Sequence, residues 1–273
     1  TGVDWGEEGL GAVYTLTNPE TFEMVHVKAV SPNREQPVLP SACDLWDIAN
    51  FYEREVYDFY GVIFVNHPDL RRIFLREDWV GFPFRKDDKP EEKNEEIAVG
   101  DEPISDLAPC YTLNADGTLH CERTPLFADD DYVINLGPQH PSTHGVLHFR
   151  TRIDGEIITK IDPHLGYIHR SIEKISEDLT YPQTLALTDR MDYLGAMQNR
   201  HALCACIEQA MGVEVSDRVQ VIRTIMDELQ RIDSHILFFS CLCQDLGATT
   251  AFLYGFRDRE KILDIFEETC GGR

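Results

Sequence analysis

The sequence predicts an α+β protein in which strands come before helices. Residues 11–30 alternate apolar and polar side chains around Asn18-Pro19-Glu20, a pattern typical of a β-hairpin. Beyond about residue 165, apolar residues recur instead at the spacing of an amphipathic helix. Because 273 residues exceed the usual size of one domain, we expect a small α+β domain, a segment of strands and hairpins, and then a helical bundle.

A helix is expected after the first hairpin. Ser41 and Asp44 have the spacing of a capping box at a helix N-terminus. The stripe that follows stops at Gly61, a residue type that commonly ends helices. Its members are Leu45, Ala49, Tyr52, Val56 and Phe59. Residues 1–86 are therefore predicted to form the small α+β domain.

An acidic stretch separates this domain from the rest of the chain. Residues 87 to 106 contain nine acidic side chains and only two lysines, which is typical of an exposed linker. Beyond it, the turn sequences at residues 114–117 and 154–155 each predict a β-hairpin. We therefore expect a linker and hairpin over residues 87–125 and a second domain over residues 126–273.

Three helices are predicted in the second domain. The first extends from about Ala186 to Met211 and ends at Gly212, the second from Ser216 to about Asp245, and the third begins near Ala251. The second helix carries an apolar stripe that we expect to be buried against neighbours. Its members are Val219, Ile222, Ile225, Leu229, Ile232, Ile236 and Phe239.

Composition narrows the class of partner. The formal net charge of −23 argues against contact with nucleic acid or an anionic lipid surface and favours basic protein partners. The eight cysteines include no Cys-x-x-Cys pair, so we predict ordinary buried thiols in a reducing setting. The longest apolar run, Ile236–Cys243, is far shorter than the roughly 20 residues that span a bilayer. No leader precedes Thr1, so the true start is expected to lie upstream.

Half of the ten histidines fall between residues 140 and 169. His148 alternates with Arg150 and Arg152, which predicts the outward face of a strand. His140 and His144 are four residues apart, but the proline and glycine around them favour a turn over a metal-binding helix. A metal site stays a minority alternative, and no nucleotide-binding glycine motif is present, so the chain is not expected to bind NADH itself.

Residues 53–76 resemble the signature of the C-type (30 kDa) subunit of respiratory complex I. The matching residues are Glu53-Arg54-Glu55, Asp58, Gly61 and His67-Pro68-Asp69-Leu70-Arg71-Arg72-Ile73. In that family the C-type subunit is a docking element without a redox centre. The resemblance therefore implies structural and interface roles for these residues.

Residues 132–273 are similar to the D-type (49 kDa) subunit of the same complex. The similarity rests on Asn-Leu-Gly-Pro-Gln-His-Pro-Ser-Thr-His-Gly at 135–145, Gly-Tyr-Ile-His-Arg at 166–170 and Arg-Met-Asp-Tyr at 190–193. It implies an internal piece of a fused C/D-type subunit whose D-type part continues beyond Arg273. It also implies a bundle related to the large subunit of nickel-iron hydrogenases.

The D-type resemblance implies a quinone-reducing site. His144 and Tyr193 match family residues that contact the quinone headgroup, and Asp245 matches an aspartate that pairs with this histidine. His169 and Arg190 match residues near the terminal iron–sulfur cluster of the B-type subunit. An imidazole with a pKa of about 6.5 and a phenol with a pKa of about 10 both donate hydrogen bonds to quinone oxygens that gain charge.

The same resemblance implies a subunit of NADH-quinone oxidoreductase, peripheral to the cytoplasmic face of the bacterial inner membrane. Its partners would be the B-type iron–sulfur subunit and the I-type, G-type and H-type subunits, and its substrate ubiquinone or menaquinone. Iron–sulfur clusters and FMN would lie in partner subunits. The chain alone would bind no metal or other cofactor and would reduce no quinone.

Two alternatives belong to other functional classes. A nickel-iron hydrogenase would carry Arg-x-Cys-Gly-x-Cys where this chain has residues 190–195. Asp192 and Gly195 stand in place of both cysteines, and without those soft ligands nickel is not held. The other alternative is an assembly scaffold with no reactive group, which the resemblance favours for the first domain only.

Overall fold

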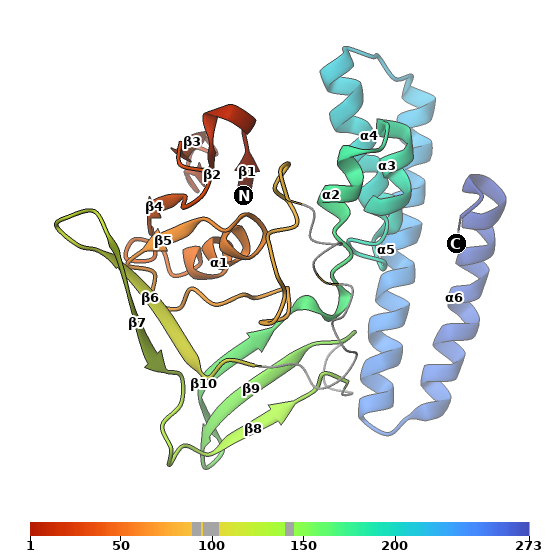
Figure 1. Ribbon diagram of the computed structural model, residues 1–273. Coiled ribbons are helices and arrows are strands. Elements are labelled where there is room, and N and C mark those ends of the chain that lie inside the picture. Colours follow the sequence, from red (N-terminus) through yellow and green to blue (C-terminus); the bar gives the residue numbers. More distant parts are fainter. Residues whose placement is uncertain (89–93, 95–103, 140–144, 273) are drawn as a thin grey trace. The chain divides into compact units, whose positions relative to one another are not determined.

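The chain folds into two compact units, residues 1–170 and residues 171–273. Figure 1 shows the computed structural model, which describes residues 1–88, 94, 104–139 and 145–272. Strands and one α-helix make up the described part of the first unit, and helices make up that of the second. The predicted mixed α+β class, with strands before a helical region, is confirmed.

Three sheets form within the described residues of the first unit. An antiparallel sheet contains β1 (Gly2–Asp4), β2 (Leu10–Thr17) and β3 (Met24–Ser31). A second has the order β4 (Val38–Pro40), β5 (Ile63–Val65), β6 (Leu107–Leu113) and β7 (Leu119–Pro125). The third has the order β10 (Ile157–His164), β9 (His148–Asp154) and β8 (Val133–Leu136). The predicted hairpins β2–β3, β6–β7 and β9–β10 are all present.

Helix α1 (Ala49–Tyr60) is shorter than the sequence predicts. It ends at Gly61, as expected, in the left-handed conformation with φ of 71°. The predicted capping box is wrong, because Ser41 and Asp44 lie before the helix begins. The Ser41 hydroxyl instead donates to the Glu53 carboxylate at 2.7 Å, a partner too distant in sequence for a local capping rule to find.

Apolar packing joins α1 to the first two sheets. The central buried cluster consists of Leu10, Ala12, Leu39, Val56, Val62, Phe64 and Leu70. The same helix buries three charged residues, Glu53, Arg54 and Asp58. Burial of a charge is costly unless it is paired and hydrogen-bonded, so these groups must find partners inside the fold.

Asp58 shows how that condition is met. One carboxylate oxygen accepts the backbone N–H groups of residues 73, 74 and 75 at 3.1, 2.8 and 2.9 Å. The other accepts Arg72 Nη1 at 2.7 Å. The side chain has no solvent exposure, so this carboxylate fixes the path of the loop that follows β5.

Two of the three residues on the face of β9 that was predicted to point outward are buried, and the third, Arg152, is half-buried. His148 is only 6% exposed and Arg150 only 9%, so that prediction was wrong. In the antiparallel register, Asp162 of β10 lies opposite Arg150, and its carboxylate pairs with the guanidinium. Strand alternation indicates which residues share a face, but not which face a neighbouring segment covers.

The second unit contains α2 (Ile172–Glu177), α3 (Tyr181–Thr188), α4 (Ala196–Met211), α5 (Asp217–Asp245) and α6 (Thr249–Cys270). The predicted helix from 186 to 211 is in fact two helices, interrupted between Thr188 and Ala196. In this break the Asp192 carboxylate accepts the Leu194 N–H at 3.0 Å, a local bond that competes with helical pairing. The predicted ends of α4 at Gly212 and of α5 at Asp245 are confirmed.

Helices α5 and α6 lie side by side (Figure 1). Most of the apolar stripe predicted to be buried on α5 is instead exposed in this chain, including Val219 and Phe239. The residues that α5 buries are Gln230, Asp233, Leu237 and Ser240. Three of these four are polar, so an apolar stripe was the wrong guide to the covered face.

The cysteine prediction also needs correction. Cys121, Cys206 and Cys270 are exposed, and the other five thiols are only partly covered. They are free cysteines, but they are not core residues. The amphipathic periodicity around them did not indicate this, because neighbouring segments determine how much of each face is covered.

We predict that Asp58→Asn lowers the free energy of unfolding by about 3 kcal/mol or more, because it leaves Arg72 without its buried charged partner. Urea unfolding followed by circular dichroism measures this. Asp78→Asn is the matched control, because Asp78 pairs with Arg76 in a more exposed position and such pairs contribute about 1 kcal/mol or less. Equal losses in the two variants would contradict the role given to Asp58.

Candidate functional site

Most of the predicted quinone-binding turn lies outside the described residues. His144, like His140, lies outside the described residues. The chain re-enters the described part at Gly145, and β9 begins at His148. The geometry of the candidate site therefore rests on Tyr193, Asp245, His169 and Arg190.

Tyr193 lies in the break between α3 and α4. Its side chain is half exposed, at 50%. Both backbone groups of the next residue are bonded, because the Asp192 carboxylate accepts the Leu194 N–H and the Leu194 carbonyl accepts Gln230 Nε2 at 3.0 Å. A fixed backbone and an exposed ring suit a phenol that meets a ligand.

Asp245 is the last residue of α5, and its side chain is exposed. Gln230, which anchors the Tyr193 segment, lies 15 positions earlier in the same helix, about 22 Å along the axis at 1.5 Å per residue. Tyr193 and Asp245 therefore belong to the same unit, but the Tyr193 segment is bonded to the middle of α5, whereas Asp245 lies at its C-terminal end. The residue that anchors the Tyr193 segment and Asp245 thus lie well apart along the helix axis.

Arg190 is positioned by a buried aspartate. Its Nη1 donates to Asp189 Oδ2 at 3.1 Å, and Arg200 of α4 donates to the same oxygen at 2.5 Å. The Arg190 side chain is 56% exposed, whereas that of Asp189 is only 6% exposed. The salt bridge orients a guanidinium that can still meet a partner.

His169, in the first unit, packs among aromatic rings. Its ring centroid lies 5.0 Å from those of Phe59 and Phe74 and 6.4 Å from that of Phe84. Phe59 comes from α1, and the other two rings come from the loop after β5. This contact was not predicted, because the aromatic residues are far from His169 in sequence.

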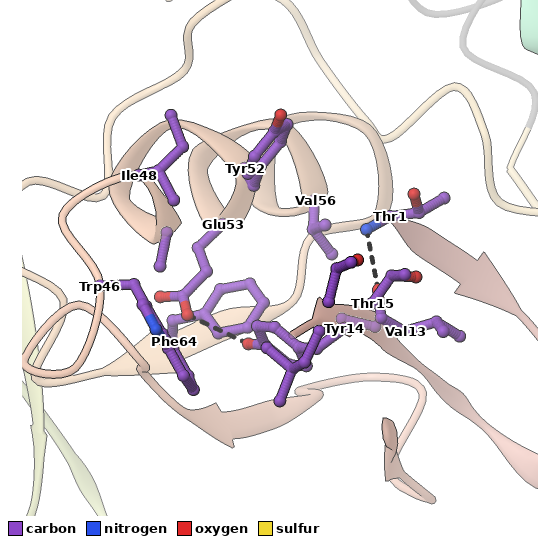
Figure 2. Close-up of a pocket in the computed structure, with 14 residues that line it drawn as sticks. Thr1, Val13, Tyr14, Thr15, Trp46, Ile48, Tyr52, Glu53, Val56 and Phe64 are labelled. Carbon is purple, nitrogen blue, oxygen red and sulfur yellow. Dashed lines mark hydrogen bonds between the residues drawn. The ribbon is translucent and has the colours of Figure 1, made fainter. Parts of the chain in front are cut away.

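A second group of potentially reactive side chains was missed at the sequence level. Single ligand atoms of Cys43, Glu53 and His67 lie within 4.8 Å of one another. Glu53 and His67 are buried. Figure 2 shows Glu53 directed from α1 toward Tyr14 of β2, beside a cavity of about 540 Å³. The three residues are widely spaced in sequence, so no motif marks the group.

These atoms are already engaged. Glu53 accepts bonds from the Tyr14 hydroxyl at 3.0 Å, the Ala42 N–H at 2.8 Å, and the hydroxyl of Ser41. Cys43 Sγ lies 3.7 Å from the same carboxylate, and burial raises the pKa of this thiol to about 11. A protonated thiol is a poor metal ligand, which favours a structural role for the group.

The imidazole of His67 is occupied on both sides. Nδ1 accepts the Asp69 N–H at 3.0 Å, so the proton is assigned to Nε2, which donates to the Asn50 carbonyl at 3.1 Å. Burial lowers the pKa of His67. A neutral ring with both nitrogens bonded holds the start of α1 against the loop after β5.

Asp162 is the centre of a further cluster that sequence reasoning missed. It accepts Arg71 Nη2 at 2.6 Å, Arg150 Nη2 at 2.6 Å and His164 Nε2 at 3.1 Å. Burial alone would raise the pKa of Asp162, but hydrogen bonds from His164 and Arg71, with Arg150, hold it well below its usual range. The carboxylate is therefore ionised and almost fully buried.

Comparison with known proteins identifies two families along the chain. Residues 1–94 match the family described as respiratory-chain NADH dehydrogenase, 30 Kd subunit. Residues 245–273 match the family described as respiratory-chain NADH dehydrogenase, 49 Kd subunit. The order of the two matches is the order predicted from the sequence motifs.

Curated relatives cover the chain more completely. The C/D subunit of NADH-quinone oxidoreductase from Phocaeicola vulgatus is 64% identical over 273 residues, all of this chain and 52% of the relative. Its counterpart from Bacteroides thetaiotaomicron is 61% identical over all of this chain and 53% of the relative. The D subunit of NADH-quinone oxidoreductase from Geotalea uraniireducens is 54% identical over 51% of this chain and 36% of the relative. The chain thus spans about half the length of the C/D relatives.

Among the described residues, no helix has both the length and the apolar character needed to cross a membrane. The long helix α5 illustrates this, because its 29 residues include acidic and basic side chains along their length.

We predict that His67 makes stability fall as the pH drops below about 6.5, the usual pKa of an unfolded histidine. The unfolded chain binds a proton in that range while the buried ring stays neutral, so protonation favours unfolding. Urea unfolding between pH 7 and pH 5.5 should show a smaller loss for His67→Gln than for the wild type. His120→Gln, at an exposed site on β7, should keep the wild-type dependence. An unchanged slope in His67→Gln would count against a neutral buried ring.

Proposed function

We propose that this chain works as part of NADH-quinone oxidoreductase, respiratory complex I. The reason is that it belongs to the family of fused C/D subunits of that enzyme. The observation that carries the proposal is similarity over the whole chain, with a 30 Kd match followed by a 49 Kd match. Because the chain spans about half of its C/D relatives, the activity is assigned to the complete complex and not to these residues alone.

The second unit contributes to quinone reduction through Tyr193. A quinone takes up two electrons and two protons, and its oxygens need hydrogen-bond donors while charge builds on them. The half-exposed phenol of Tyr193 on an anchored backbone supports this role. The remainder of the site comes from the turn containing His144 and from the B-type iron–sulfur subunit.

Asp245 acts through His144 as a positioning residue. A carboxylate beside an imidazole fixes its tautomer and favours its protonated form. Asp245 lies about 22 Å along the α5 axis from Gln230, which bonds the residue after Tyr193, and this separation supports giving Tyr193 and Asp245 different roles. Loss of the histidine proton on quinone reduction would change the charge of the site, and we infer that this change is coupled to proton translocation.

Arg190 and His169 are assigned to the surroundings of the terminal iron–sulfur cluster held by the B-type subunit. Positive charge and hydrogen bonds near such a cluster make its reduction easier. The exposed guanidinium of Arg190, oriented by Asp189, supports this role more directly than the ring of His169 does. We therefore expect Arg190 to be the main electrostatic contributor.

The remaining assignments follow the family. Residues 1–86 form a C-type docking domain, residues 87–125 a linker and hairpin, and residues 126–273 the first part of a D-type domain related to nickel-iron hydrogenase large subunits. Partners are the B-, I-, G- and H-type subunits, and FMN and the iron–sulfur clusters lie in partner subunits. The complex then holds this chain at the cytoplasmic face of the bacterial inner membrane.

We predict that Tyr193→Phe in the complete enzyme lowers quinone reduction by about 10²-fold or more, because a positioned hydroxyl donor is lost. NADH oxidation with an artificial acceptor that bypasses the quinone site should be unchanged. Tyr181→Phe, at another exposed tyrosine of the same unit, is the matched control and should retain turnover. Normal quinone reduction in Tyr193→Phe would favour the scaffold alternative.

We predict that Asp245→Asn, which removes the charge without removing the side chain, uncouples the enzyme in part. The variant should reduce quinone more slowly and translocate fewer protons per electron pair, because the histidine loses the partner that favours its charged form. Proton uptake and NADH oxidation measured together in vesicles give the ratio. An unchanged ratio in an active variant would refute the coupling role.

A further inference from the structure

Tyr193 lies at the second position of a β-turn between α3 and α4. The Gly195 N–H closes this turn by donating to the Asp192 carbonyl at 3.0 Å. The Asp192 carboxylate also accepts the Leu194 N–H at 3.0 Å. These bonds determine the shape of the turn, but all of them lie within it. The position of the turn beside the helices must therefore be set by groups that belong to those helices.

A side-chain amide of α4 makes one attachment. Asn199 Nδ2 donates to the Asp192 carbonyl at 3.1 Å, so this carbonyl accepts two N–H groups. Asn199 lies in the first turn of α4 and is half-buried. The bond therefore holds the residue before Tyr193 against the start of α4.

A side-chain amide of α5 makes the other attachment. Gln230 Nε2 donates to the Leu194 carbonyl at 3.0 Å, across 36 positions of the sequence. Gln230 is only 3% exposed, so its amide depends on protein partners more than on water. Leu194 directly follows Tyr193. A shift of the Leu194 carbonyl would therefore shift the backbone that carries the phenol.

A buried ion pair sets the orientation of the Gln230 amide. Nε2 carries two hydrogens, and its second partner is Asp233 Oδ2 at 3.2 Å. Asp233 has no solvent exposure, and its Oδ1 lies 3.2 Å from Arg259 Nε of α6. Burial raises the pKa of Asp233, whereas Arg259 opposes this rise. A carboxylate paired with a guanidinium only accepts hydrogen bonds, so it faces the Nε2 end of the amide and not its oxygen.

We propose that Gln230 and Asn199 are positioning residues for the phenol of Tyr193. The Asp233–Arg259 pair is assigned the supporting role of keeping the Gln230 amide directed at the turn. The inference rests on the proposed contact between Tyr193 and the quinone, and it gives Gln230 no contact of its own with the substrate. The effect is geometric, because displacing a reacting group by about 1 Å can lower a rate by about 10²-fold.

Gln230→Met in the complete enzyme tests the attachment to α5. Methionine has a similar length but no donor, so the turn loses its bond to this helix. We expect kcat for quinone reduction to fall about 10-fold or more with a smaller change in KM, because the phenol matters most while charge builds on the quinone oxygens. Gln220→Met, at an exposed site of α5, should match the wild type. Wild-type kcat in Gln230→Met would overturn the inference.

A double variant shows whether Gln230 acts through Tyr193. In a Tyr193→Phe background, Gln230→Met should cause little further loss of quinone reduction, because the hydroxyl that it positions is already absent. An equal fold-loss in both backgrounds would indicate a general structural role and would overturn the inference. Wild-type turnover in Tyr193→Phe alone contradicts the proposed function. Loss in Tyr193→Phe with wild-type kcat in Gln230→Met contradicts only the positioning role.

Asn199→Ala covers the case in which Gln230→Met does not assemble. Its bond to the turn is solvent-exposed, so the substitution leaves no buried group unpaired. The kcat for quinone reduction should fall about 3-fold or more, again with little further loss in Tyr193→Phe. Gln209→Ala, at an exposed site of α4, is the control, and NADH oxidation with an artificial acceptor checks assembly of each variant. Wild-type kcat in Asn199→Ala would overturn the role of that residue and, with an unassembled Gln230→Met, the whole inference.

Discussion

The carboxylate of Asp162 is the constraint on which the arrangement of the first unit depends. It is ionised, 3% exposed, and bonded to Arg71, Arg150 and His164. An isolated charge in such a position would be very costly, so these partners are needed to keep the carboxylate ionised there. The loop after β5 and strands β9 and β10 are thereby fixed relative to one another, and the β8–β10 sheet belongs to the same compact unit as α1.

The C-type motif is also explained by buried charged groups that need partners. Glu53, Arg54 and Asp58 point from α1 into the protein, where each meets backbone groups that would otherwise lack partners. Arg54 donates to the carbonyls of Arg71 and Arg72, and Asp58 accepts N–H groups just beyond them. The helix therefore shapes a loop whose own side chains continue the network toward Asp162. A motif that suggests surface charge is mostly interior.

Local signals predicted local structure well. Asp154-Gly155 and residues 114–117 form the hairpin turns, and Gly61 and Gly212 end helices in the left-handed conformation, because these features depend on neighbours in sequence. Features that depend on distant partners were missed or wrong. The outward face of β9 and the buried stripe of α5 failed because periodicity identifies a face but not what covers it. The Asp162 cluster joins residues 91 positions apart, and no short motif records it.

In the candidate site too, the sequence indicated individual residues but not the distant residues that surround them. The motif at residues 190–193 led to Tyr193. The structure adds that Asp192 and Gln230 bond the N–H and the carbonyl of Leu194, the next residue, in the break between α3 and α4. The motif did not reveal how far Asp245 lies along α5 from Gln230, which bonds the residue after Tyr193. Sequence similarity indicates which residues match, but not how far apart they lie. If Asp245 does not contact the quinone itself, it influences the quinone only through an intermediate group. Coulomb attraction weakens with distance and with screening by water and salt, so an exposed carboxylate such as Asp245 acts mainly on a group close to it. This is why Asp245 is assigned an electrostatic role through a histidine, while Tyr193 is assigned direct contact.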